Sequence, residues 1–119
     1  MSRDSTEFDA VLDLCRDHHR RIVLAVLAEE RRPLTMNDLS KAILKYNHST
    51  PVTEVSEEVL TEIRLSLYHE HIPKLESEEI IEYDPERQHV VPTERFDQLR
   101  PSLSVIIEVD PDLQVPVEL

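Results

Sequence analysis

Apolar residues recur at intervals of three and four along most of the chain, which is the spacing of amphipathic helices. This spacing predicts helices over residues 6–15 and 17–30, either separate or fused. Pro33 disfavours helix in the residue before it, so a short extended piece is expected there. Thr35 then provides an N-cap for a third helix over residues 35–47. The first part of the chain is therefore predicted to be helical.

A fourth helix is predicted over residues 57–77 from the same apolar spacing. Pro73 lacks an N–H and clashes with the carbonyl of His69, so we expect a kink or break near it. After this helix the apolar period shortens to that of a strand. Two short apolar runs flank Asp84 and Pro85, which suit the first two positions of a type I turn. These runs are predicted to pair as a β-hairpin.

The last helical stripe lies near the C-terminus and consists of Phe96, Leu99, Leu103 and Ile106. One small domain does not obviously need so large an apolar stripe to cover its core. We therefore predict that these four residues form a homodimer interface. Residues 110–119 contain two prolines and no helical period, which predicts an extended or mobile tail. The chain is thus divided into one domain, residues 1–109, and this tail.

The composition is strongly acidic, with 25 acidic and 13 basic residues and a formal net charge of −12. Such a charge repels nucleic acid at ordinary ionic strength. However, the acids are dispersed and arginine outnumbers lysine, a composition that resembles cytosolic proteins of salt-loving archaea. Molar salt shortens the screening length to about 3 Å, which weakens the repulsion. Cys15 is the single cysteine, and no apolar run approaches the length of a membrane span, so we expect a cytoplasmic protein.

The sequence contains no glycine, which excludes the usual forms of phosphate loops, dinucleotide fingerprints, nucleophile elbows and EF-hand loops. The remaining candidate for chemistry is the His-Glu-His triplet, which could contain metal ligands. On a helix, His69 and His71 point about 200° apart and cannot share a metal ion. His71 should instead face the core beside a polar partner, while His69 faces solvent. We therefore predict no metal site and no cofactor, whereas enzymes that need no glycine stay possible at this point.

Basic residues form the other candidate group, because several of them occur as pairs. They could contact phosphates, or they could belong to ordinary solvated faces. The pairs and the isolated residue at the predicted turn are Arg20 with Arg21, Arg31 with Arg32, Lys41 with Lys45, and Arg87.

The order of helices, extended piece and hairpin is that of a winged helix-turn-helix. The segments HRRIVLAVLAEERRPLTMNDLSKAIL, LYHEHIPKLESEEIIEYD and VPTERFDQL make the resemblance specific. They are similar to a family of uncharacterised winged helix-turn-helix domains of halophilic archaea, related to small transcription regulators. This resemblance implies a winged-helix fold, DNA binding and frequent dimers, without catalytic residues, so we expect no enzymatic activity. Related domains commonly have glycine before the first wing strand, where Glu78 and Glu79 stand here, so this helix end is expected to close differently.

The predicted fold is mainly α with a small β-hairpin, an α+β winged helix-turn-helix with an additional C-terminal helix. The expected function is that of a homodimeric, sequence-specific transcription regulator that binds double-stranded DNA at high salt. On the outer face of the fourth helix, the residues predicted to enter the major groove are Thr61, Leu65, Ser66 and His69. Phosphate contacts are predicted for Lys41, Lys45 and Arg64, and a backbone or minor-groove contact for Arg87 in the wing.

An alternative function follows from the acidic start of the same helix. Glu57, Glu58 and Glu62 would repel the phosphates around a major groove. A winged-helix scaffold with an acidic binding face could instead serve as a protein–protein interaction module with a basic partner. Both functions stay open from the sequence.

Overall fold

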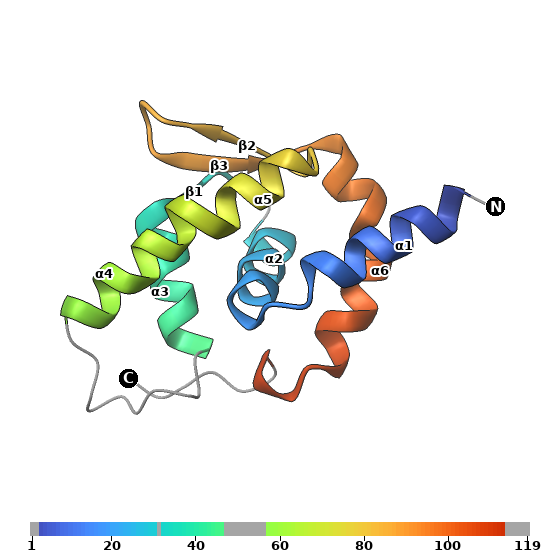
Figure 1. Cartoon of the computed structure of the whole chain (residues 1–119), viewed down its shortest axis with the longest axis horizontal. Coiled ribbons are helices and arrows are strands. Elements are labelled where there is room, and N and C mark those ends of the chain that lie inside the picture. The colour runs from blue at the N-terminus through green and yellow to red at the C-terminus, as the bar shows by residue number, and fades with distance from the viewer. Residues whose placement is uncertain (1–2, 31, 47–56, 114–119) are drawn as a thin grey trace.

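The computed structural model describes residues 3–30, 32–46 and 57–113, and in these residues helices predominate (Figure 1). A small three-stranded antiparallel sheet, in the order β1-β3-β2, lies along one edge. The predicted α+β class is therefore confirmed. The elements are α1 (Arg3–Leu14), α2 (His18–Glu30), β1 (Leu34–Thr35), α3 (Met36–Tyr46), α4 (Glu57–Ser66), η2 (Leu67–His71), α5 (Ile72–Ser77), β2 (Ile81–Asp84), β3 (His89–Pro92), α6 (Glu94–Val109) and η3 (Pro111–Leu113).

The first two helices are separate, because Asp17 starts a new helix after a short turn. Its carboxylate accepts a hydrogen bond from the backbone N–H of Arg20 at 3.1 Å, as an N-cap does. The predicted cap of α3 is confirmed by a reciprocal pair of bonds. The N–H of Thr35 donates to the Asp38 carboxylate and the N–H of Asp38 donates to the Thr35 hydroxyl, each at 3.0 Å.

The helix predicted over residues 57–77 is continuous, but its middle turn is a π-helix. In this segment, η2, the N–H of Ile72 donates to the carbonyl of Leu67, five residues earlier. The wider turn lies immediately before Pro73, where the missing N–H and the bulky ring disturb the α-helical pattern. The expected irregularity near Pro73 is thus a π-turn. In the sequence, Ser56 is a usable N-cap for this helix, but it lies outside the described residues.

The end of α5 corrects the expectation that it closes without a left-handed residue. Glu79 has a φ of 62° and occupies the position where glycine is most common. The N–H of Glu79 donates to the carbonyl of Glu76 at 2.9 Å, and the N–H of Ile80 donates to the carbonyl of Leu75 at 3.2 Å. These two bonds form a Schellman motif, and the buried side chains of Leu75 and Ile80 supply the apolar contact that accompanies it.

The predicted hairpin is confirmed, and it gains a third strand. β2 pairs with β3 from Ile81 opposite Pro92 to Asp84 opposite His89. β1, the short extended piece after Pro33, pairs with the other side of β3. We call the hairpin β2–β3 and its turn, residues 85–88, the wing.

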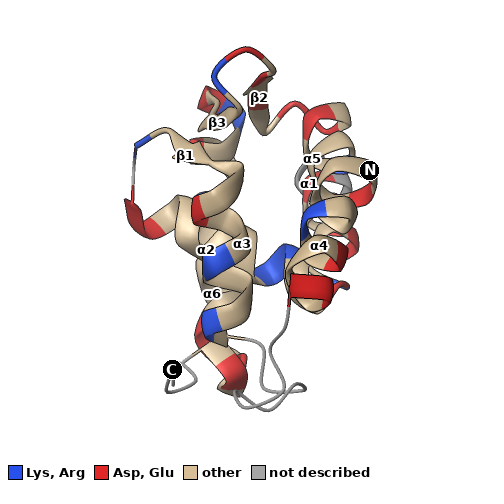
Figure 2. Ribbon diagram, turned by 90° about the vertical axis from the view of Figure 1, so that its left-hand side faces the viewer, with Lys and Arg blue, Asp and Glu red and all other residues tan. Residues whose placement is uncertain are grey.

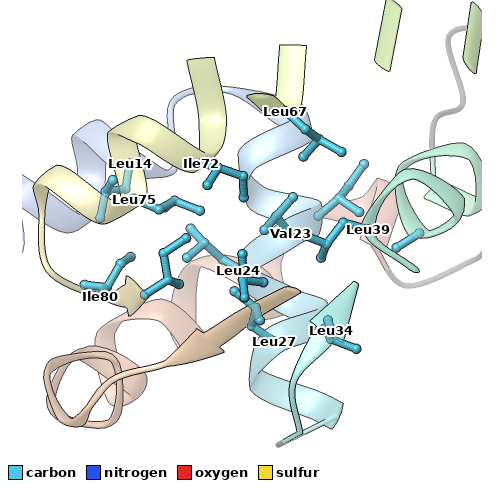
Figure 3. Packing of buried hydrophobic residues seen from close by; sticks show 14 of the residues in the cluster. Leu14, Val23, Leu24, Leu27, Leu34, Leu39, Leu67, Ile72, Leu75 and Ile80 are labelled. Carbon is cyan, nitrogen blue, oxygen red and sulfur yellow. The ribbon is translucent and has the colours of Figure 1, made fainter. Parts of the chain in front are cut away.

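The core is mainly aliphatic and lies between α2, the inner side of α4–η2–α5, and the sheet. Figure 3 shows Leu67, Ile72 and Leu75 directed toward α2, from which Val23 and Leu24 meet them. Burying each such side chain contributes about 1.5–3 kcal/mol. This common core fixes the helix and the wing relative to each other.

The apolar stripe of α6 belongs to this same core, which corrects the predicted dimer interface. Phe96, Leu99 and Leu103 are 0%, 3% and 0% exposed, so the chain itself covers them. Ile106 is half-buried and packs against the core. Exposed apolar side chains of α6 are instead Val105 and Val109. The helix runs through Pro101 without a break.

The start of the predicted tail is folded rather than extended. Asp110 is buried and pairs with Arg21, its carboxylate oxygen 2.7 Å from Nε of the guanidinium. Residues 111–113 then form the single 3-10 turn η3, and residues 114–119 lie outside the described part of the chain. Within the described ranges, no helix combines the length and apolar character that a membrane crossing requires.

Candidate nucleic-acid interface

The helix α4–η2 presents two chemically different sides. Its inner side, including Ile63 and His71, is buried. Its outer side exposes Thr61, Leu65 and His69, and Leu65 is 50% exposed. Ser66, the fourth residue predicted to contact bases, is half-buried. We call Thr61, Leu65 and His69 the outer face of the helix.

The predicted phosphate-binding cations do not form one cluster. The Arg64 guanidinium donates to the side-chain oxygen of Asn37 at 3.5 Å, which joins α4 to the start of α3. Lys41 and Lys45 are exposed on α3 and border a shallow hollow whose walls include Glu29 and other residues of α2. The two lysines therefore lie toward α2, whereas Arg64 lies where α3 and α4 meet.

The tip of the wing holds Arg87 in a defined backbone position. The Asp84 carboxylate accepts hydrogen bonds from the N–H groups of Glu86 at 2.9 Å and Arg87 at 3.3 Å. The guanidinium of Arg87 is 3.9 Å from the same carboxylate, and its side chain is 77% exposed. An exposed ion pair of this length is worth less than about 1 kcal/mol, so the cation can exchange it for another anion.

Two residues that the sequence analysis did not select join the wing to the helix. The Tyr68 hydroxyl, on η2, donates a hydrogen bond to the side-chain oxygen of Gln88 at 3.2 Å. The Tyr68 ring also meets the ring of Tyr83, on β2, edge to face at a centroid distance of 6.3 Å. Burial raises the pKa of the Tyr83 hydroxyl, and the neighbouring Tyr68 hydroxyl raises it further.

Only one of these two residues had a signal in the sequence. Tyr68 follows Leu65 by three residues, so it lies on the same exposed side of the helix. Gln88 adopts a φ of 52°, and nothing in its residue type announces a left-handed backbone.

The electrostatic character of this end of the molecule is mixed. Figure 2 views it and shows basic segments on α3 and α4, an acidic segment at the start of α4, and both signs at the wing. Glu57, Glu58 and Glu62 are exposed. In the part of the chain that the structure describes, none of the three forms an ion pair. Their charges are therefore not neutralised by the cations beside them.

The two histidines of the triplet have the separate environments that helical spacing predicts. His71 is 2% exposed, and its Nε2 lies 3.8 Å from the Asp17 carboxylate, whereas His69 is exposed. The Nδ1 atom of His71 is buried and has no hydrogen-bond partner within the described structure. Burial lowers the pKa of His71 in spite of Asp17, which acts in the opposite direction. Over residues 3–30, 32–46 and 57–113, no group of three potential metal ligands comes together.

Comparison with known proteins places the chain in one family. A family model described as a domain of unknown function (DUF7344) matches residues 12–91, about two thirds of the chain. The match includes α2, α3, the long helix and most of the wing, and it ends before α6. No curated protein and no solved structure matches the chain.

Proposed function

We propose that this chain, which belongs to the DUF7344 family, is a winged-helix DNA-binding protein that regulates transcription. The observation that carries the proposal is the arrangement of α3, α4–η2 and the wing. The long helix exposes one side, α3 precedes it, and the wing lies beside it. This order supports the winged helix-turn-helix assignment and the resemblance to regulators of halophilic archaea.

In the proposed complex, α4–η2 is the recognition helix and enters the major groove. Thr61, Leu65 and His69 reach base edges, where a hydroxyl, an apolar side chain and an imidazole distinguish different bases. Arg64 contacts phosphate beside the groove, and Arg87 reaches the backbone or the minor groove. Lys41 and Lys45 would meet phosphates only at the outer edge of α3, because they border the hollow toward α2.

Binding in molar salt must depend on fit and on a few placed cations. At a formal charge of −12, general attraction to DNA is absent, and counterion release contributes little at high salt. Direct base contacts and groove shape are less sensitive to salt than phosphate contacts are. The exposed outer face of the helix is suited to such contacts.

The proposal is tested by selecting sequences from random DNA and then measuring affinity between 0.1 and about 3 M potassium chloride. We expect a preferred sequence. Arg87→Ala should weaken binding to all sequences alike and lower the salt slope by about 1, whereas His69→Ala should change the sequence preference. Absence of DNA binding over the whole salt range would overturn the proposal.

The acidic start of α4 favours a second candidate function. Glu57, Glu58 and Glu62 form an exposed acidic edge next to Leu65, a combination that suits a basic, amphipathic protein partner. The substitution of all three by glutamine discriminates the two functions. It should strengthen DNA binding if the carboxylates oppose phosphates, and it should abolish binding to a protein partner.

Dimerisation also belongs to the proposal, but the dimer interface is now assigned to α1 and the exposed side of α6. The side chains available for contact are Phe8 and Leu12 on α1, 49% and 47% exposed, and Val105 and Val109 on α6, 63% and 74% exposed. Each pair is one helical turn apart, and the two helices pack on each other. Val105→Glu should therefore give monomers in sizing at high salt, and a wild-type chain that already runs as a monomer would contradict the dimer.

A further inference from the structure

We propose that Tyr68 is a positioning residue that fixes the wing to the recognition helix, so that Arg87 and the helix engage DNA together. The inference rests on the proposed function and adds the contact that holds the wing and the recognition helix in a fixed arrangement. No base or phosphate contact is assigned to Tyr68 itself.

Gln88 is the point where three elements meet. Its side-chain oxygen accepts the hydrogen bond from Tyr68 on η2 at 3.2 Å. Its backbone carbonyl accepts a hydrogen bond from the N–H of Met36, the first residue of α3, at 3.0 Å. One residue of the wing is therefore bonded both to the recognition helix and to the helix before it.

The left-handed backbone of Gln88 is consistent with this role. A φ of 52° is unfavourable for a residue other than glycine, asparagine or aspartate, and such conformations persist where surrounding bonds determine them. Glycine would adopt the same φ without strain but would offer no side-chain acceptor to Tyr68. Gln88 therefore adopts an unfavourable backbone conformation but keeps the side-chain hydrogen bond to Tyr68.

Tyr68 also holds the other strand of the wing. Its ring contacts Tyr83 at an interplanar angle of 82°, and Tyr83 pairs with Val90 across the hairpin. Edge-to-face pairs of this kind are favourable beyond the burial of the two rings. The same side chain thus contacts β2 through its ring and the turn through its hydroxyl.

The consequence concerns Arg87, which directly precedes Gln88. Asp84 fixes the backbone of Arg87 within the turn, and Tyr68 fixes the turn relative to the helix. When two binding elements are held at the correct separation, engagement of one raises the effective concentration of the other at its site. A wing released from Tyr68 would lose this advantage while Arg87 kept its charge.

The first experiment measures the contact without DNA. The chain contains three tyrosines and no tryptophan, so absorbance at alkaline pH follows tyrosine ionisation directly. Tyr68→Phe should lower the pKa of Tyr83 toward its ordinary value, because the Tyr68 hydroxyl contributes to raising it. Tyr46→Phe, the same change on α3, is the matched control and should leave the ionisation of Tyr83 unchanged. An unchanged Tyr83 in Tyr68→Phe would mean that the Tyr68 hydroxyl does not lie beside β2, and the contact between η2 and the wing on which the proposal rests would be absent.

The second experiment is a double-mutant cycle on DNA affinity with Tyr68→Phe, Arg87→Ala and both together. Tyr68→Phe should weaken binding about two- to tenfold, the value of one net hydrogen bond. Arg87→Ala should then weaken binding by a smaller factor in the Tyr68→Phe protein than in the wild type. Any decrease in melting temperature caused by Tyr68→Phe should be the same with Arg87 and with Arg87→Ala, so the non-additivity should appear in DNA affinity alone, which a merely structural role of Tyr68 would not predict.

The outcomes separate this inference from the function on which it rests. DNA binding by the wild type with additive losses in the cycle would overturn the positioning role and leave the DNA-binding function standing. No DNA binding by the wild type would overturn both. Equal losses for Tyr68→Phe and the Tyr46→Phe control would likewise exclude a specific role for Tyr68.

Discussion

Basic residues have different tasks in two regions of the molecule. At the corner between α1 and α2, Arg20 donates to the carbonyls of Leu14 at 2.9 Å and Asp13 at 3.3 Å. Arg21 next to it donates to the carbonyl of Cys15 at 2.6 Å and pairs with Asp110. At the wing, by contrast, the guanidinium of Arg87 forms one long ion pair within the described residues. Its partner is the Asp84 carboxylate, at 3.9 Å.

The difference teaches that a pair of arginines in the sequence is not evidence of a binding surface. Arg20 and Arg21 were candidates for phosphate contacts, but they donate to carbonyl groups at and just after the end of α1, where a helix no longer supplies intrahelical N–H partners for its last carbonyls. The side chain of Arg21 is only 24% exposed. These two arginines stabilise the fold, whereas the exposed Arg87 on the wing can exchange its long ion pair for another anion. Arg31, from the other pair, lies outside the described residues.

The largest expected effect comes from breaking the corner. Arg21→Met would remove the guanidinium that pairs with the Asp110 carboxylate, which is 8% exposed, and the hydrogen bond to the carbonyl of Cys15 just after α1. Removing one partner of a largely buried ion pair should lower the free energy of unfolding by about 2–4 kcal/mol. Chemical denaturation at fixed salt measures the loss. A variant within about 0.5 kcal/mol of the wild type would mean that the two arginine groups do not differ as argued.

A second test of the corner uses pH, because His71 packs against it. The groups that face His71 are Asp17, Arg20 and Glu70, together with the ring of His19 at a centroid distance of 6.1 Å. Burial lowers the pKa of His71 below its ordinary 6.5 in the folded state, so the unfolded chain binds a proton first as the pH falls. The contribution to stability is therefore complete above pH 6.5 and decreases as the pH falls toward the folded-state pKa. Protonation would bury an N–H at Nδ1 without an acceptor, which costs about 1–3 kcal/mol.

Melting temperatures between pH 7.5 and 5 would detect this loss. His71→Leu should reduce the decrease, although burial also lowers the pKa of His19, so part of the decrease should remain. His69→Leu, on the exposed side of the same segment, is the matched control and should follow the wild type. If both variants behaved alike, the buried histidine would not be the source of the pH dependence.

The sequence predicts the elements that depend on neighbouring residues. The cap of α3, the hairpin around Asp84 and the opposite directions of His69 and His71 follow from local spacing and turn chemistry, and the structure confirms them. The irregular turn near Pro73 was also expected, though not its π form. Each of these features is decided by residues that lie close together in the chain.

Contacts between distant segments could not be predicted in this way. The partner of Arg21 is 89 residues away, and Tyr68 reaches Gln88 over 20 residues. The apolar stripe of α6 has the same spacing whether it packs inside one chain or between two, so only the fold shows that Phe96, Leu99 and Leu103 are covered. Periodicity states which side of a helix is apolar, and the tertiary structure decides what lies against it.

A smaller effect is expected at the left-handed end of α5. Glu79→Gly would relieve a φ of 62° while the backbone bonds of the Schellman motif remain. Since non-glycine residues are unfavourable in this conformation, we expect a gain of up to about 1 kcal/mol in unfolding free energy. The same change at Glu78, whose φ is −87°, should destabilise or have no benefit. Equal effects at both positions would show that the left-handed backbone does not matter.

The smallest effect on stability is expected for Arg87→Met, the counterpart of Arg21→Met. Its side chain is 77% exposed and its ion pair with Asp84 is long, so the free energy of unfolding should change by less than about 0.5 kcal/mol. The N–H of Arg87 would still donate to Asp84, so the turn should keep its shape. The same variant should nevertheless lower the salt dependence of DNA binding by about one ion. A destabilisation as large as that of Arg21→Met would place Arg87 among the structural arginines, and the wing would then lack the cation that the proposed function requires.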